Sequence, residues 1–307
     1  MVTIKGKSYM SDFEAKKAIL EVGKRMYAKG FVAANDGNIS CKAGPDTFWT
    51  TCTGVSKGFM TQDMLVKMDM KGKILFGQRK PSSEVKMHMR VYEENPEVMA
   101  VTHAHPPVAT SFAIAGIGLD KAVLPEAVVQ LGSVPVARYA TPGTQEVPDS
   151  IAPFCQDYNG VLLANHGALS WGTDVFQAFY RLESIEYYAQ ILMYTGNILG
   201  KQNELSCGQV DELMGIREKL GLGSGGAPSC AVHASNTKDI MTKQAQITGQ
   251  PSGLNGVTPL VTPEPATSCG CGSIQPPQDV QSDKKTKEQI MAEVVRRVTE
   301  RLGSEMR

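Results

Sequence analysis

Two short stretches decide the expected fold: VMAVTHAH at residues 98–105 and NGVLLANHGALSW at residues 159–171. Both are rich in β-branched and apolar residues. The second is almost entirely apolar, which is typical of a strand buried on both faces. VPVARYA at residues 134–140 predicts a further strand. Together they predict the interior of a sheet that must be covered on its faces.

The sequence around these strands has helical period. Apolar residues recur at helical spacing in four segments, which predict helices over residues 11–29, 83–94, 173–199 and 208–220. Ser11 is a suitable N-cap for the first helix, and Asn95-Pro96 ends the second. Helices and strands that alternate over residues 1–222 predict one α/β domain in which helices cover a central sheet.

Composition argues against several classes of partner. The chain has 307 residues, with 31 Lys+Arg against 31 Asp+Glu, so the net charge is zero and nucleic-acid binding is not expected. No apolar run approaches the roughly 18–20 residues that a membrane span needs. The N-terminus has no signal-peptide core, so a cytoplasmic protein is expected. An odd number of cysteines, seven, then predicts reduced thiols.

The composition changes near Leu222. Residues 223–283 are dominated by Pro, Gly, Ser and Thr, which predicts a flexible linker. Cys269 and Cys271 form a C-x-C pair in this linker. Such a pair could bind a metal or carry redox chemistry, but the favoured interpretation is that these cysteines do neither. Residues 284–307 place apolar side chains on one stripe, which predicts a terminal amphipathic helix.

Three of the five histidines lie in the strand-like stretches. His103 and His105 form an HxH unit, and on a strand such residues point to the same face about 6–7 Å apart. His166 lies in the apolar stretch, where an unpaired ring would be costly. Three histidines and one open position are typical of a catalytic zinc site. The alternative is that they are ordinary strand residues, as is expected of His88 in its helix and His233 in the linker.

Polar residues cluster at one helix start and in two turns. Glu84 lies at the N-terminus of the helix predicted over residues 83–94. The hydroxyls of Ser82 and Ser83, just before Glu84, could either cap this helix or bind a phosphate. Residues 35–40 and 53–58 are two further polar turns that contain glycine. Each alone is best explained as a connector, but together the three could form an anion-binding nest.

These segments resemble the class II aldolase/adducin family, in particular its L-fuculose-phosphate aldolase-like enzymes. The resemblance covers about residues 10–220 in the right order. The matching motifs are GNIS (37–40), TG (53–54), PSSE (81–84), THAHP (102–106), YATPGTQE (139–146) and ANHG (164–167). It implies a three-layer α/β/α domain with a central sheet, usually assembled as a homotetramer.

The resemblance also implies roles for individual residues. The implied zinc ligands are His103, His105 and His166, although another divalent metal could replace zinc. Glu84 is the implied acid/base residue. The implied phosphate-binding residues are Asn38, Thr53, Gly54, Ser82 and Ser83. No organic cofactor is implied.

The implied reaction is the aldol cleavage of a ketose 1-phosphate of the fuculose, rhamnulose or 5-deoxypentulose type. It would give dihydroxyacetone phosphate and an aldehyde such as lactaldehyde through a zinc-stabilised enediolate. The chain departs from the L-fuculose-phosphate aldolases at two places, both of which concern the aldehyde end of the substrate. These enzymes carry a tyrosine near each place. No tyrosine is present here in AVLPEAVVQLG (122–132), where Glu126 is the charged group, or in KLGLG (219–223). The alternatives are a 4-epimerase or dehydratase on the same scaffold, or a non-catalytic adducin-like protein.

The linker and terminal helix resemble the encapsulation peptides of bacterial microcompartment cargo. Residues 284–307 are therefore expected to bind a shell protein or other cargo, which would place the enzyme inside a microcompartment. The alternative is an ordinary terminal helix that packs on its own tetramer.

Overall fold

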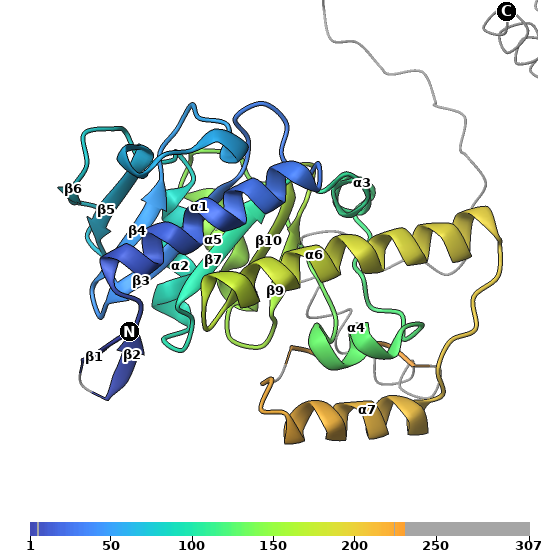
Figure 1. The fold of residues 1–307 in the computed structure, drawn as a ribbon. Helices are drawn as coiled ribbons and strands as arrows, with labels where there is room; N and C mark the ends of the chain where they lie inside the picture. The colour runs from blue at the N-terminus through green and yellow to red at the C-terminus, as the bar shows by residue number, and fades with distance from the viewer. Residues whose placement is uncertain (5, 224, 231–307) are drawn as a thin grey trace, which may run out of the picture. The chain divides into compact units, whose positions relative to one another are not determined.

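The computed structural model describes residues 1–4, 6–223 and 225–230. Its central sheet consists of β3 (Asn38–Gly44), β4 (Thr47–Thr51), β5 (Leu65–Asp69), β6 (Ile74–Phe76), β7 (Ala100–Ala104), β8 (Val136–Ala137), β9 (Gly160–Leu163) and β10 (Gly167–Gly172). The strand order is β6-β5-β4-β3-β7-β10-β9-β8 (Figure 1). Neighbouring strands are antiparallel except β8 and β9, which are parallel. A separate hairpin is formed by β1 (Val2–Ile4) and β2 (Lys7–Tyr9).

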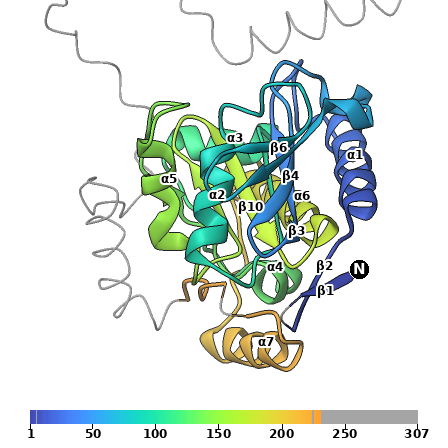
Figure 2. The same cartoon turned by 90° about the vertical axis from the view of Figure 1, so that its left-hand side faces the viewer.

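Helices cover both faces of this sheet. They are α1 (Asp12–Ala28), α2 (Val85–Glu94), α3 (Pro107–Ala115), α4 (Pro125–Gln130), α5 (Glu146–Ile151), α6 (Val175–Leu192) and α7 (Cys207–Lys219). Helices α1 and α6 lie on one face, and α2 and α5 lie on the other (Figure 2). The predicted three-layer α/β/α architecture is confirmed.

The helix boundaries follow from local capping. The Ser11 side chain accepts from the backbone amide of Glu14, whose carboxylate accepts from the Ser11 amide, so α1 begins with a capping box. The Asp174 carboxylate accepts from two backbone amides in the first turn of α6. After Leu192 this helix continues as a π-helix to Ile198, so the segment predicted over residues 173–199 is one helix with a change of winding.

The stretch NGVLLANHGALSW is a β-hairpin, and its prediction as one strand was wrong. Its two halves, β9 and β10, pair antiparallel, and Asn165 in the turn has a positive φ of 57°. His166 therefore lies in a turn, and His105 lies one residue beyond the end of β7. The apolar composition on both sides conceals the turn, because both strands of this hairpin are interior to the sheet.

The prediction that all cysteines are reduced was also wrong. Cys207 and Cys230 form a disulfide, while Cys41, Cys52 and Cys155 are buried free thiols. A cysteine count cannot show this pairing, since it depends on how the chain returns after α7. Cys269 and Cys271 lie outside the described residues.

The packed part of the chain extends past Leu222. The carbonyl of Gly225 accepts from the Ser133 amide at 3.1 Å, and the Ser229 amide donates to the carbonyl of Asp120 at 2.7 Å. The remainder of the predicted linker and residues 284–307 lie outside the described residues. Among the residues that are described, no helix has the length and apolar character to cross a membrane.

Candidate metal centre and acid/base site

Three histidine rings converge beside the central strands. The ring centroids of His103, His105 and His166 lie 4.8 to 5.2 Å apart. One potential ligand atom from each lies within 4.8 Å of the others. The two segments meet because β7 and β10 pair antiparallel, which places the end of β7 beside the start of β10. The sheet thus joins histidines that are far apart in the chain.

Two glycines let the backbone close around this point. Gly37 has a φ of 75°, and a Cβ there would lie 2.8 Å from the carbonyl oxygen of His103. A Cβ on Gly167 would lie 2.5 Å from the carbonyl oxygen of Ala104 and 2.6 Å from Cδ2 of His105. A side chain at either glycine would push apart the segments that carry the histidines.

The outer nitrogens of two rings have partners, which leaves the inner nitrogens for a cation. Nδ1 of His103 donates to the carbonyl oxygen of Ala168 at 2.9 Å. Nδ1 of His105 lies 3.4 Å from Oδ2 of Asp36. In the described part of the chain, Nε2 of each of these two histidines is buried without a hydrogen-bond partner. Metal-binding histidines are usually oriented in this way, so the donor set fits a divalent cation such as zinc.

Glu84 is the carboxylate beside the three histidines. Its Oε1 lies 3.0 Å from Nε2 of His166, and its Oε2 lies 3.5 Å from Nε2 of His103. Burial raises the pKa of this carboxyl, but His103, His166 and the Asn38 amide outweigh burial and hold the pKa well below its usual range. Burial also lowers the pKa of His103 to about 3. The site therefore combines an ionised carboxylate with a neutral imidazole at neutral pH.

A buried chain of hydrogen bonds runs from Glu84 into the core. Nδ2 of Asn38 donates to Oε2 of Glu84 at 2.7 Å, and Oδ1 of Asn38 is hydrogen-bonded to Nε2 of His88. Nδ1 of His88 lies 2.7 Å from Oγ of Ser40, which lies 2.6 Å from the Tyr92 hydroxyl. His88, expected to be an ordinary helix residue, is therefore linked to the site. Its i, i+4 spacing from Glu84 is the signal that could have revealed it.

The predicted phosphate-binding turns run side by side. The Thr53 amide donates to the carbonyl of Lys80 at 3.0 Å, and the Ser82 amide donates to the carbonyl of Thr51 at 3.1 Å. Three of the predicted residues are exposed: Thr53, Gly54 and Ser83. Ser82 is buried. Asn38 is also buried and contacts Glu84. It begins β3, so the prediction of a turn over residues 35–40 was wrong for residues 38–40.

Lys57 ties two of the polar turns together. Its ammonium donates to the carbonyl of Asn35 at 2.8 Å and to the carbonyl of Val55 at 2.7 Å. Burial lowers the pKa of Lys57 to about 8. Sequence reasoning missed this residue, because a lysine in a polar turn normally reaches into solvent.

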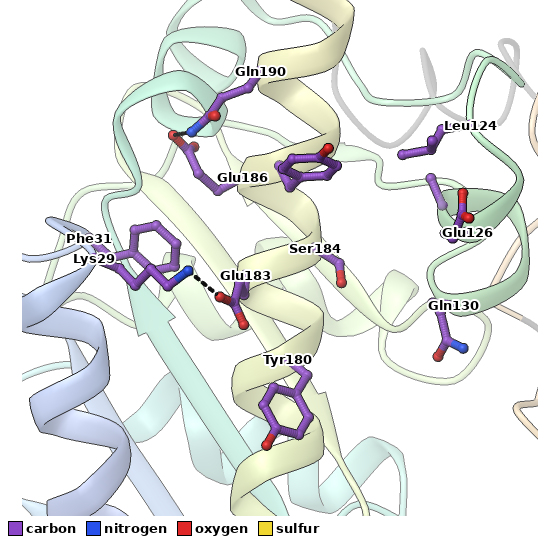
Figure 3. Close-up of a pocket in the computed structure, with 12 residues that line it drawn as sticks. Lys29, Phe31, Leu124, Glu126, Gln130, Tyr180, Glu183, Ser184, Glu186 and Gln190 are labelled. Carbon is purple, nitrogen blue, oxygen red and sulfur yellow. Dashed lines mark hydrogen bonds and ion pairs between the residues drawn. The ribbon is translucent and has the colours of Figure 1, made fainter.

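A groove of about 650 Å³ lies along α6 and α4 and does not include the three histidines (Figure 3). On its wall, Lys29 pairs with Glu183 at 2.6 Å. Glu186, also on the wall, is buried and accepts from the amides of Val108 and Ala109 at 3.1 and 2.8 Å. It thereby fixes the first turn of α3, the helix that follows the HxH segment. Periodicity alone did not distinguish Glu186 from the solvated residues of a long helix.

The fold agrees with that of a known family. The family model for the class II aldolase and adducin N-terminal domain matches residues 17–193. This chain belongs to the class II aldolase and adducin family. The match contains the three histidines, Glu84 and the three polar turns.

Relatives with two different names are similar to this chain. The chain is 29% identical over 216 residues to a 3-oxo-tetronate 4-phosphate decarboxylase of Escherichia coli, covering 66% of this chain and 99% of the relative. It is also 29% identical over 179 residues to an L-fuculose phosphate aldolase of Methanococcus maripaludis, covering 58% and 96%.

Solved structures of the family are also similar. An L-fuculose 1-phosphate aldolase superposes with a TM-score of 0.63 at 28% identity, covering 70% of this chain and all of that one. The L-fuculose-1-phosphate aldolase of Thermus thermophilus has a TM-score of 0.53 at 29% identity, covering 59% and 93%.

The donor set predicts that metal binding depends on the histidines. After zinc loading and dialysis, the protein should retain about one zinc per chain, since three imidazoles hold a catalytic zinc. His103→Ala and His105→Ala should retain less than about a tenth of that, because two protein ligands bind poorly. His88→Gln is the matched control and should keep its zinc. Elemental analysis checks all four proteins, and full zinc content in His103→Ala would contradict the assignment.

The buried His88 predicts a pH-dependent stability. Burial lowers its pKa from 6.5 to about 4, opposed by Glu84, so the unfolded chain binds a proton between these pH values that the native state does not. Stability should therefore fall as the pH drops through this window, by up to about 3 kcal/mol from this group.

Urea titration of the metal-free protein at pH 7 and pH 4.5 measures this loss. His88→Gln should lose less stability than the wild type over that interval. Equal losses in the two proteins would show that His88 titrates normally in the folded state.

Proposed function

We propose that this protein is a metal-dependent lyase that acts on a phosphorylated sugar and forms an enediolate. The observation that carries the proposal is the position of Glu84, whose Oε1 lies 3.0 Å from Nε2 of His166, in a triad where Nε2 of His103 and Nε2 of His105 have no hydrogen-bond partner. When bound, a divalent cation there supplies Lewis-acid stabilisation of negative charge on substrate oxygens.

The two reactions for which these relatives are named, aldol cleavage and decarboxylation, form the same intermediate. In a ketose 1-phosphate, breaking the C3–C4 bond releases an aldehyde and leaves the C2–C3 enediolate of dihydroxyacetone phosphate. In a 3-oxo-tetronate 4-phosphate, breaking the C1–C2 bond releases carbon dioxide and leaves the same enediolate. Protonation of its carbon then gives dihydroxyacetone phosphate in either case. A site that stabilises this enediolate can therefore serve both reactions.

The residues of this chain suit the steps on the enediolate side. Glu84 is ionised and can accept a proton, and as its acid form it can return one to the enediolate carbon. The turns that contain Thr53 and Ser83 lie side by side and offer the exposed hydroxyl groups of these two residues to a phosphate. Anchoring the phosphate would hold the reacting carbon in register with Glu84.

We place aldol cleavage of a fuculose-, rhamnulose- or 5-deoxypentulose-type 1-phosphate first, with zinc as the metal and lactaldehyde as a typical aldehyde product. Decarboxylation is the second candidate, and one observation favours it. The segment at residues 122–132 has Glu126 but no tyrosine to accept the C4 hydroxyl proton as the C3–C4 bond breaks and the aldehyde forms. Carbon dioxide departs from a carboxylate, which has no such proton to lose. Epimerisation or dehydration at the same centre stays a third possibility. A non-catalytic adducin-like role leaves the buried unpartnered nitrogens unexplained.

We also propose that the chain assembles as a homotetramer. Large apolar and aromatic side chains are exposed along α1, α6 and the segment that follows α6, including Phe13, Tyr180, Tyr187, Ile198 and Leu199. Exposed apolar surface of this kind is typical of protein–protein interfaces.

One assay series separates the reactions. The zinc-loaded protein is offered the three ketose 1-phosphates and 3-oxo-tetronate 4-phosphate, and dihydroxyacetone phosphate, aldehyde and carbon dioxide are each measured. Aldehyde release identifies an aldolase, carbon dioxide a decarboxylase, and an epimer without dihydroxyacetone phosphate an epimerase.

Glu84→Gln should lower kcat by about 10²–10⁴-fold, the usual contribution of a positioned acid/base, and a chelator should abolish the reaction. Full activity in both Glu84→Gln and His103→Ala would overturn the mechanism.

We propose that residues 284–307 direct the enzyme to a bacterial microcompartment, on the basis of their apolar stripe and the preceding linker. Deleting residues 280–307 should leave activity intact and release a fused fluorescent protein from compartment puncta. Puncta that remain unchanged after the deletion would exclude this role.

A further inference from the structure

In the chain of hydrogen bonds that runs from Glu84 into the core, the donor of each bond follows from the chemistry of its side chain. The NH2 of Asn38 donates to Oε2 of Glu84 at 2.7 Å. That leaves the Asn38 oxygen facing His88, and an amide oxygen only accepts. Nε2 of His88 must then carry the ring proton.

The rest of the chain follows from this protonation. A neutral imidazole with its proton on Nε2 has an acceptor at Nδ1, so the Ser40 hydroxyl donates to His88. Having used its proton, Ser40 accepts from the hydroxyl of Tyr92. Every donor in the chain thus points toward Glu84.

We infer that His88 is a positioning residue for Glu84, because its Nε2 proton holds the Asn38 amide in the one orientation that donates to the carboxylate. The inference rests on the proposed function for the role of Glu84 as acid/base. It assigns His88 no contact with substrate or metal.

The location of the chain supports positioning rather than proton transport. Ser40 and His88 are fully buried, and Tyr92, at the far end, is 3% exposed. A chain that ends in the core has no solvent from which to draw protons. What it can do is prevent rotation of Asn38, since each buried polar group already has its partner.

Two substitutions at one position separate this role from simple packing. The amide nitrogen of His88→Gln can reach the position of Nε2 and still donate to Asn38. The shorter side chain of His88→Asn reaches only the position of Nδ1, next to Ser40. We expect kcat of His88→Asn to fall by about 10- to 100-fold, since a displacement of about 1 Å in a catalytic group can cost about 10²-fold.

In His88→Gln, kcat should stay within about threefold of the wild type, and KM should change little in both variants, because the phosphate turns are untouched. Tyr92→Phe removes only the last donor and should lower kcat by less than His88→Asn does. Tyr9→Phe, in the N-terminal hairpin, is the matched control and should match the wild type. Equal kcat values for the Gln and Asn variants would overturn the inference.

A spectroscopic measurement tests the same inference without turnover. In the full-length zinc-loaded protein labelled with ¹⁵N-histidine, the His88 ring should be neutral with its proton on Nε2, assigned by the loss of its signals in His88→Gln. A proton on Nδ1, or a charged ring at pH 7, would overturn the inference. If the wild type cleaves none of the substrates offered, the proposed function fails, and the protonation of His88 alone decides whether the orienting chain exists.

Discussion

The structure depends on the close approach of three backbone segments at the end of β7. Gly37 lies against the carbonyl of His103 on one side, and Gly167 lies against the carbonyl of Ala104 on the other. A methyl group at either glycine would overlap a carbonyl oxygen. This approach brings the turn at His166 within reach of the HxH segment. Without it the three rings would have no common centre.

A second constraint is the spacing of the polar side chains where α2 packs against β3. Glu84, His88 and Tyr92 are spaced by four on α2, so they form one stripe, while Asn38 and Ser40 are spaced by two on β3. The two rows interdigitate, so that each helix side chain is bonded to the strand residue beside it. A buried polar row of this kind is costly unless every member is satisfied. Here the satisfied row ends on the carboxylate of Glu84, which is the acid/base residue in the proposed function.

In the proposed function, one part of the site is used by both aldol cleavage and decarboxylation, and another part differs between them. Under that proposal, the histidines, Glu84 and the polar turns would serve the enediolate and its phosphate, which aldol cleavage and decarboxylation share. The segment around Glu126 lines the groove that does not include the three histidines, and this segment contains no tyrosine. The site residues therefore define the enediolate, which both reactions form, more closely than they define the group that leaves the substrate.

The sequence did not reveal α3, α4, α5 or the strands β3 to β6. By itself it determined the layered α/β class, the approximate limits of α1, α2, α6 and α7, and the set of three histidines with Glu84. Those features depend on local period, capping and motif spacing, which are present in the order of the residues. Only the tertiary structure decided that 159–171 is a hairpin, since both of its strands are interior and an apolar run conceals the turn. It alone paired Cys207 with Cys230. It alone joined Asp36 to His105 and His88 to Asn38, because those contacts arise from strand register and helix packing between residues distant in the chain.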